Sequence, residues 1–107
     1  MDILMEKTSL AATVEFRIGS DERSSYRVVP VSLFLIGTPD PTDADDKIEV
    51  QFPDESNPAS VVWVTAKVGG EDVVLDKDTN IQTIYGPGKF RLNRPAGGTA
   101  AIGVALM

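Results

Sequence analysis

The feature that most constrains this chain is a series of short runs in which apolar and polar residues alternate. The clearest run is Leu10–Ile18, with Leu, Ala, Val, Phe and Ile on one face and Ala, Thr, Glu and Arg on the other. Alternation at every second residue predicts a half-buried β-strand. Turn signals rich in Gly, Pro, Asp and Ser recur about every ten residues, which predicts an all-β, single-domain antiparallel β-sandwich or small barrel of about eight strands.

Other runs of the same kind are expected to form the remaining strands. The most apolar is Tyr26–Ile36, where Pro30 predicts an edge position, a bulge or two shorter strands. Gly69-Gly70 predicts a two-residue hairpin. The further runs are Ile48–Phe52, Ser60–Val68, Glu71–Leu75 and Thr99–Leu106.

The stretch Ile81–Pro95 joins two alternating runs through Gly-Pro-Gly at 86–88. Proline presets one turn dihedral and glycine tolerates positive φ, so this pattern predicts a tight β-hairpin. Pro95 is expected to end the second strand, because it has no N–H to donate to a ladder.

The N-terminal residues 1–8 have no clear period, so the β-sandwich domain is expected at 9–107. Their apolar residues Ile3, Leu4 and Met5 would form an arm that docks on a neighbour, the start of an edge strand, or a frayed terminus. Acidic residues stand where a signal peptide carries positive charge, so no secretory signal is expected. No apolar segment approaches the roughly 20 residues that a membrane helix needs.

The composition excludes several classes of partner and of catalytic chemistry. The formal net charge is −6, so neither nucleic acid nor an anionic membrane is expected as a partner, since both bind clustered Lys and Arg. Cysteine and histidine are absent, which excludes disulfides, thiol nucleophiles and a Ser-His-Asp triad. A glycosidase-like pair needs two acids about 5–10 Å apart in a cleft, whereas the acids here fall in loops or on wet faces. We therefore predict no enzyme activity, no catalytic residue and no cofactor.

An acidic loop, GTPDPTDADD at 37–46, is the best candidate for a metal site. Its carboxylates, at Asp40, Asp43, Asp45 and Asp46, have a spacing at which loop residues converge on Ca²⁺. The loop lacks the glycine and the distal Glu of an EF-hand. A solvated acidic loop is the favoured interpretation, so no metal is predicted.

The single tryptophan admits two interpretations. Trp63 lies among valines, which favours a role as the packing centre of the sandwich. Alternatively, Trp63 and Tyr85 form an aromatic platform for a sugar.

Positive charge is expected on the outward face of the strand that follows the Gly-Pro-Gly turn. Its residues are Lys89, Arg91 and Arg94. Because the chain is otherwise acidic, these side chains are candidates for pairing with acids of a neighbouring subunit, namely Asp43, Asp45 or Asp46. Such pairs fix register more than they add affinity. With Ile3, Leu4 and Met5, these residues are the predicted subunit or capsid contacts.

Two segments near the C-terminus carry a recognisable pattern. QTIYGPGKFRLNRP at 82–95 places an aromatic residue, Arg, an aliphatic residue, a basic residue and Pro after a turn, and TAAIGV at 99–104 is a small-residue strand. Together with the Trp63 strand and the Gly69-Gly70 turn, they resemble small β-rich structural proteins of tailed bacteriophages.

The resemblance implies a non-enzymatic virion component. Its most specific form is a capsid decoration, or cement, protein that binds the major capsid protein on the outer face of the phage head and stabilises it. Decoration proteins of this size are often trimers, so self-association as a homotrimer is implied, as are synthesis in the host cytoplasm and a place on the capsid exterior. The alternatives are a tail, baseplate or head-fibre module, or a carbohydrate-binding adhesion module. No catalytic residue is carried over by the resemblance.

Overall fold

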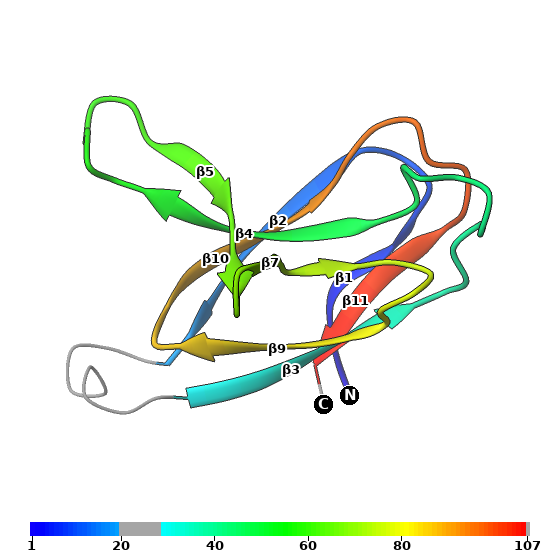
Figure 1. Cartoon of the computed structure of the whole chain (residues 1–107), viewed down its shortest axis with the longest axis horizontal. Coiled ribbons are helices and arrows are strands. Elements are labelled where there is room, and N and C mark those ends of the chain that lie inside the picture. Colours follow the sequence, from blue (N-terminus) through cyan, green and yellow to red (C-terminus); the bar gives the residue numbers. More distant parts are fainter. Residues whose placement is uncertain (20–28, 107) are drawn as a thin grey trace.

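The chain forms two main antiparallel sheets in the computed structural model, which describes residues 1–19 and 29–106 (Figure 1). The first sheet has the order β1 (Asp2–Thr8), β11 (Ile102–Leu106), β3 (Val29–Ile36) and β9 (Ile81–Gly86). The second has the order β2 (Ala12–Ile18), β10 (Gly88–Arg94), β4 (Ile48–Asp54) and β5 (Val62–Thr65), and β8 (Val74–Leu75) also pairs with β4. A separate hairpin joins β6 (Lys67–Val68) to β7 (Glu71–Asp72).

The predicted all-β sandwich is confirmed. Side chains from both sheets form one apolar core, and the alternation of β2 appears directly as alternating burial along the strand. Among the described residues no helix is long and apolar enough to cross a membrane. The fully buried members of the core are Leu33, Ile48, Val50, Val73, Leu75, Ile84, Leu92, Ile102 and Val104.

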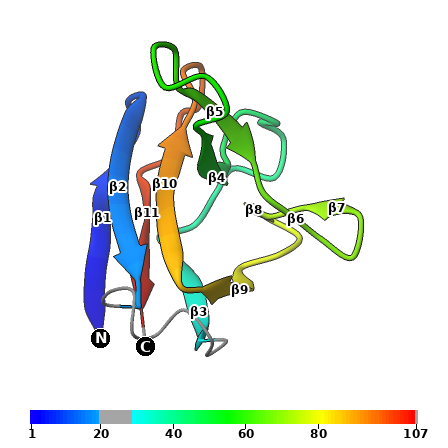
Figure 2. The same ribbon diagram turned by 90° about the vertical axis from the view of Figure 1, so that its left-hand side faces the viewer.

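The hairpin predicted within Ile81–Pro95 is wrong. β9 pairs with β3 in the first sheet, whereas β10 pairs with β2 and β4 in the second. The Gly-Pro-Gly turn is therefore a corner at which the chain passes from one sheet to the other (Figure 2). Gly86 lies so close to Ile18 that a Cβ there would overlap its side chain. Both strands alternate as predicted, but each finds its partners far away in the sequence.

The predicted Gly69-Gly70 turn is confirmed, and Pro30 adopts one of the three arrangements predicted for it. Gly69 and Gly70 have φ of +63° and +85°, and they close the two-residue hairpin between β6 and β7. Pro30 lies on a stretch of β3 that pairs only with β9, because the pairing of β3 with β11 covers Leu33–Ile36. The missing N–H of Pro30 is thus tolerated at a local edge. The start of the run Tyr26–Ile36, at 26–28, lies outside the described residues.

The N-terminal segment is an edge strand, so the expected arm and frayed terminus are both wrong. β1 pairs with β11 through a bulged register. Ile3 is 51% exposed and Leu4 is half-buried, but Met5 is 2% exposed and belongs to the core. Residues 2–8 are therefore part of the sandwich, and Met5 is not accessible as the predicted contact.

The second sheet opens at one end. β10 pairs with β4 only from Glu49 to Gln51, and beyond Gln51 β4 pairs with β5 alone. These outer parts of the two strands, residues 52–54 and 62–65, form what we call the β4–β5 arm, which extends away from the rest of the sheet in Figure 1.

Candidate functional site

Arg94 is the last residue of β10 and points into the protein. It has the same parity as Phe90 and Leu92, whose side chains face the core, and it is fully buried. The expected outward orientation is therefore wrong. The signal was present in the sequence, because residues 90, 92 and 94 must share one face of a strand.

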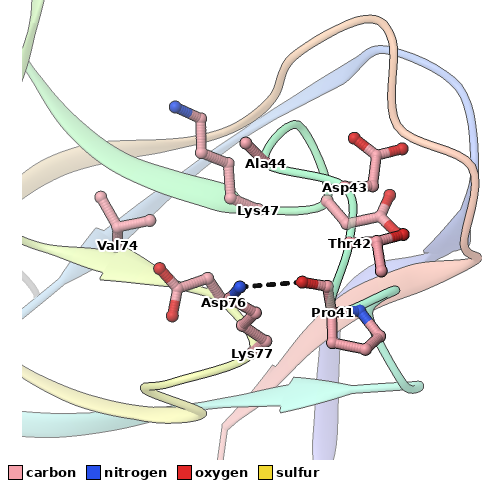
Figure 3. Close-up of a pocket in the computed structure, with 9 residues that line it drawn as sticks. Pro41, Thr42, Asp43, Ala44, Lys47, Val74, Asp76 and Lys77 are labelled. Atoms are coloured by element: carbon pink, nitrogen blue, oxygen red, sulfur yellow. Dashed lines mark hydrogen bonds between the residues drawn. The ribbon is translucent and has the colours of Figure 1, made fainter.

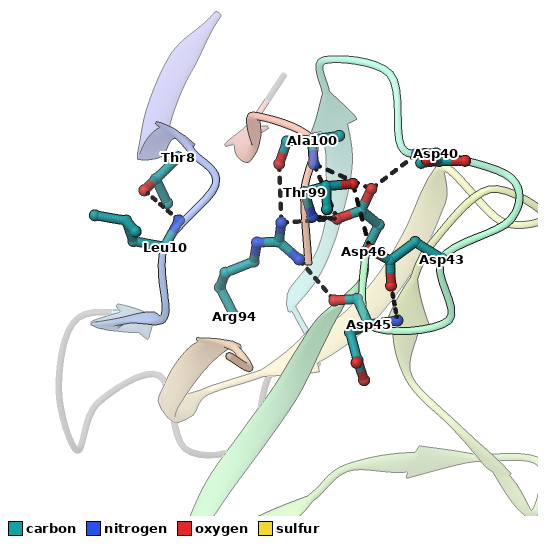
Figure 4. Close-up of polar contacts among 9 residues, drawn as sticks. All are labelled: Thr8, Leu10, Asp40, Asp43, Asp45, Asp46, Arg94, Thr99 and Ala100. Atoms are coloured by element: carbon teal, nitrogen blue, oxygen red, sulfur yellow. Dashed lines mark hydrogen bonds and ion pairs between the residues drawn. The ribbon is translucent and has the colours of Figure 1, made fainter. Parts of the chain in front are cut away.

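The Arg94 side chain is hydrogen-bonded to two loops, the one before β4 and the one after β10 (Figure 4). Its Nη2 donates to Asp46 Oδ1 at 2.9 Å and to the Ala100 carbonyl at 2.8 Å, while Nη1 donates to the Asp45 carbonyl at 2.6 Å. Asp46 also accepts the backbone N–H groups of Asp40 and Thr99, at 2.8 and 2.9 Å. The charged groups are thus bonded from several sides, which a buried ion pair requires.

Asp46 remains ionised in this environment. Burial raises the pKa of its carboxyl, but the hydrogen bonds from Asp40, Arg94, Ala100 and Thr99 together outweigh burial. The pKa of Asp46 consequently lies below its ordinary value.

The predicted pairing of Arg94 with an acid of another subunit is corrected by this geometry. Arg94 pairs with Asp46, as the charges suggested, but within one chain, and both side chains are fully buried. Neither is available to a partner. Asp45 and Asp43 are respectively exposed and half-buried, and remain predicted contacts.

The acidic loop is built from internal hydrogen bonds. Asp40 accepts the N–H and hydroxyl of Thr42, which lower the pKa of Asp40, and Asp43 accepts the N–H of Asp45 at 2.9 Å. A pocket of about 390 Å³ lies beside the loop, where Lys77 Nζ donates to the Pro41 carbonyl (Figure 3). Within the described residues, no group of three or more acids is placed to hold a metal ion.

Trp63 is on the outer face of the second sheet and does not belong to the core, so its predicted role as the packing centre is wrong. The Arg91 guanidinium lies 4.6 Å from the centre of the indole ring, and Lys89 Nζ lies 5.9 Å from it. Arg91 also donates two hydrogen bonds to Gln51 Oε1, and Lys89 pairs with Glu15 at 3.3 Å. This cluster joins four adjacent strands by polar contacts.

An apolar groove lies between the β4–β5 arm and the end of β9. We call it the open groove. It holds a pocket of about 240 Å³, and Tyr85, one of its lining residues, is 53% exposed. No sequence signal marked the groove, because Phe52 alternates in phase with buried Ile48 and Val50 but is 39% exposed. The lining residues are Phe52, Ala66, Lys67, Val68, Ile84, Tyr85 and Phe90.

The groove does not form the predicted aromatic platform, because Tyr85 lines it and Trp63 does not. The lining side chains are apolar apart from Lys67 and the Tyr85 hydroxyl. A surface of this kind is suited to apolar side chains of another protein.

No protein-family model matches this chain, and searches of curated proteins and of solved structures likewise return no match.

Proposed function

We propose that this chain is a non-enzymatic structural protein that acts by binding another protein through the open groove. The observation that carries the proposal is the exposed apolar lining at the end of the sandwich, where Phe52 and Tyr85 are 39% and 53% exposed. Exposed apolar side chains gathered in a concave surface are a feature of protein-binding sites.

In its specific form, the proposal is a capsid decoration protein of a tailed phage. The resemblance of residues 82–95 and 99–104 is its basis, and the partner would be the major capsid protein on the outer face of the head. The net charge of −6 agrees with a protein that works outside a nucleic-acid-filled shell. Many copies bound to a symmetric shell need little affinity per copy, so one small groove is sufficient.

Electron microscopy of phage particles made with and without this chain tests the location. The expected result is additional density on the outer surface of the head shell when the chain is present. Density confined to the tail or baseplate would replace the decoration role by the tail-module alternative.

A matched pair of substitutions on β9 tests the groove itself. Tyr85 lines the groove and Ile81 does not, yet their exposed fractions are nearly equal, at 53% and 51%. Tyr85→Asp is expected to abolish binding to heads in a co-sedimentation assay, because it places a carboxylate in an apolar contact. Ile81→Asp is expected to bind as the parent chain does. Equal binding by both variants would contradict a role for the groove.

A carbohydrate-binding module is the second candidate, and the exposed Tyr85 ring beside Phe52 and Phe90 favours it. Aromatic rings at a pocket offer a stacking surface for a sugar. On a glycan array this candidate predicts binding that Tyr85→Ala removes. A blank array at high protein concentration would reject it.

A further inference from the structure

β5 is an open edge of the second sheet. It pairs with β4 on one side, and no strand in the described part of the chain pairs with its other side. An edge strand presents a row of N–H and C=O groups that is ready to pair with another strand.

The pairing with β4 shows which backbone groups of β5 face outward. The N–H of Ala66 donates to the Val50 carbonyl at 2.8 Å, so Ala66 faces β4, and Val64 and Val62 follow with the same parity. The register places Pro53, which has no N–H, opposite Trp63, in agreement with this phase. The N–H and C=O groups of Trp63 and Thr65 therefore point to the open side, and Val61, the residue just before β5, continues the same parity.

This edge lacks the features that protect the other edges. β1 carries charges and a bulged register, and β2 carries Glu15 and Arg17. β9 is covered near Gln82, whose side chain donates to the Val74 carbonyl of β8. The segment from Val61 to Ala66, VVWVTA, has no charge, proline or glycine, which are the usual devices against edge pairing.

The exposed valines of the segment add an apolar contribution. Val61, Val62 and Val64 are 46%, 56% and 37% exposed. On a chain with net charge −6, a contact between two copies must avoid like charges, and this uncharged edge satisfies that condition. The edge is thus complementary to itself.

We propose that two copies of this chain pair through their β5 edges, antiparallel and related by a two-fold axis, so that the second sheet continues from one copy into the other. The register that pairs all outward-facing groups places Trp63 opposite its counterpart and Val61 opposite Thr65 of the second copy. It forms about six backbone hydrogen bonds, two for each such pair. On the inner face, Val62 then lies beside Val64 of the second copy.

This pairing does not rest on the virion role, and it differs from the trimer that the resemblance implies. The open groove also stays free in it, since the contact is made by the edge of β5. Loss of dimer formation and loss of head binding are therefore separate results.

Sedimentation equilibrium of the whole chain over a range of concentrations, with two variants of Thr65, tests the proposal. Thr65→Pro removes one outward N–H, and Thr65→Ala keeps it, while both lose the hydroxyl bond to Glu49 at 3.2 Å. The parent chain and Thr65→Ala are expected to form a dimer, and Thr65→Pro to dimerise at least about tenfold more weakly, since each dimer loses two hydrogen bonds. A monomeric parent chain, or a trimer, would overturn the proposal.

A mixing experiment does not depend on how well Thr65→Pro folds. In the proposed register, Val62→Lys lies beside position 64 of the second copy, so Val62→Lys and Val64→Glu are each expected to weaken the homodimer. An equimolar mixture is expected to restore the dimer through a Lys–Glu pair across the two strands. A mixture no more associated than either variant alone would contradict the register.

Discussion

The two ends of the sandwich differ in how the same strand is covered. At the start of β4, Ile48 and Val50 are fully buried, whereas Phe52, on the same face of the same strand, is 39% exposed. At the closed end, the loops before β4 and after β10 are held over the core by Arg94 and Asp46. At the open end, the β4–β5 arm leaves the sheet.

The difference shows that burial here is decided by long-range contacts rather than by the residue pattern alone. Apolar residues recur at every second position along both strands, as Ile48, Val50 and Phe52 on β4 and as Val62 and Val64 on β5. One end has a charged pair that anchors the covering loops, and the other has an apolar surface that is suited to a partner. The closed end accordingly carries stability, and the open end is where we place binding.

The largest expected effect tests the closed end. Arg94→Met removes the cation from a fully buried pair and leaves the Asp46 carboxylate charged beside an apolar side chain. The free energy of unfolding is expected to fall by about 3–5 kcal/mol, the usual cost of breaking a buried pair. Urea unfolding followed by tryptophan fluorescence measures the loss.

Arg91→Met is the matched control, on the same strand but with an outward side chain. It loses the bonds to Gln51 and the contact with the Trp63 ring. The expected loss is about 1–2 kcal/mol, because Arg91 and the Trp63 ring are only half-buried and water replaces part of the contacts. Similar losses for both variants would remove the distinction between the buried pair and the surface cluster.

Much of the fold could be predicted from the sequence, because strand alternation and turn chemistry are local. Gly69 and Gly70 form the predicted hairpin, and Pro30 lies at a local edge, one of the three arrangements predicted for it. The partner of a strand is not local information: the Gly-Pro-Gly segment at 86–88 has the composition of a hairpin turn and forms a corner between two sheets. Because β10 pairs with β2 and β4, the segment does not form the hairpin that its composition favours.

The candidate site was less predictable than the fold. Parity along β10 was sufficient to place Arg94 inside, and charge was sufficient to suggest an aspartate partner, but the pairing within one chain depends on loops distant in the sequence. The open groove left no signal, because the exposure of Phe52 arises where β4 separates from β10, and register determines that position.

A smaller effect on the free energy of unfolding is expected when the same substitution is made at the two ends of the inner face. Val50→Thr places a hydroxyl in the fully buried core, whereas Val62→Thr places it on a side chain that is 56% exposed. The first is expected to lower the free energy of unfolding by about 1–3 kcal/mol and the second by less than about 0.5 kcal/mol. Both are read from urea unfolding at low protein concentration, where self-association is minimal. A large loss at Val62 would mean that the arm is covered within a single chain.

The smallest expected effect is the acid dependence of the closed end. Because the pKa of Asp46 is lowered in the folded chain from the ordinary value of 3.8, its ionised form stabilises the fold. That contribution is complete above the unfolded-state pKa and is lost as the pH falls through the folded-state pKa. The parent chain and Asp46→Asn are compared by urea unfolding between about pH 3 and pH 7. The difference between their free energies of unfolding is expected to be constant above about pH 5 and to narrow only below about pH 4.

Asp54→Asn is the control at the open end. Hydrogen bonds from Ser56 also lower the pKa of Asp54, but its side chain is exposed, so a weaker pH dependence of the free energy of unfolding is expected. The opposite result would be a difference in the free energy of unfolding that stays constant down to pH 3 for Asp46→Asn and narrows only for Asp54→Asn. That result would contradict the assignment of the stabilising charge to the closed end.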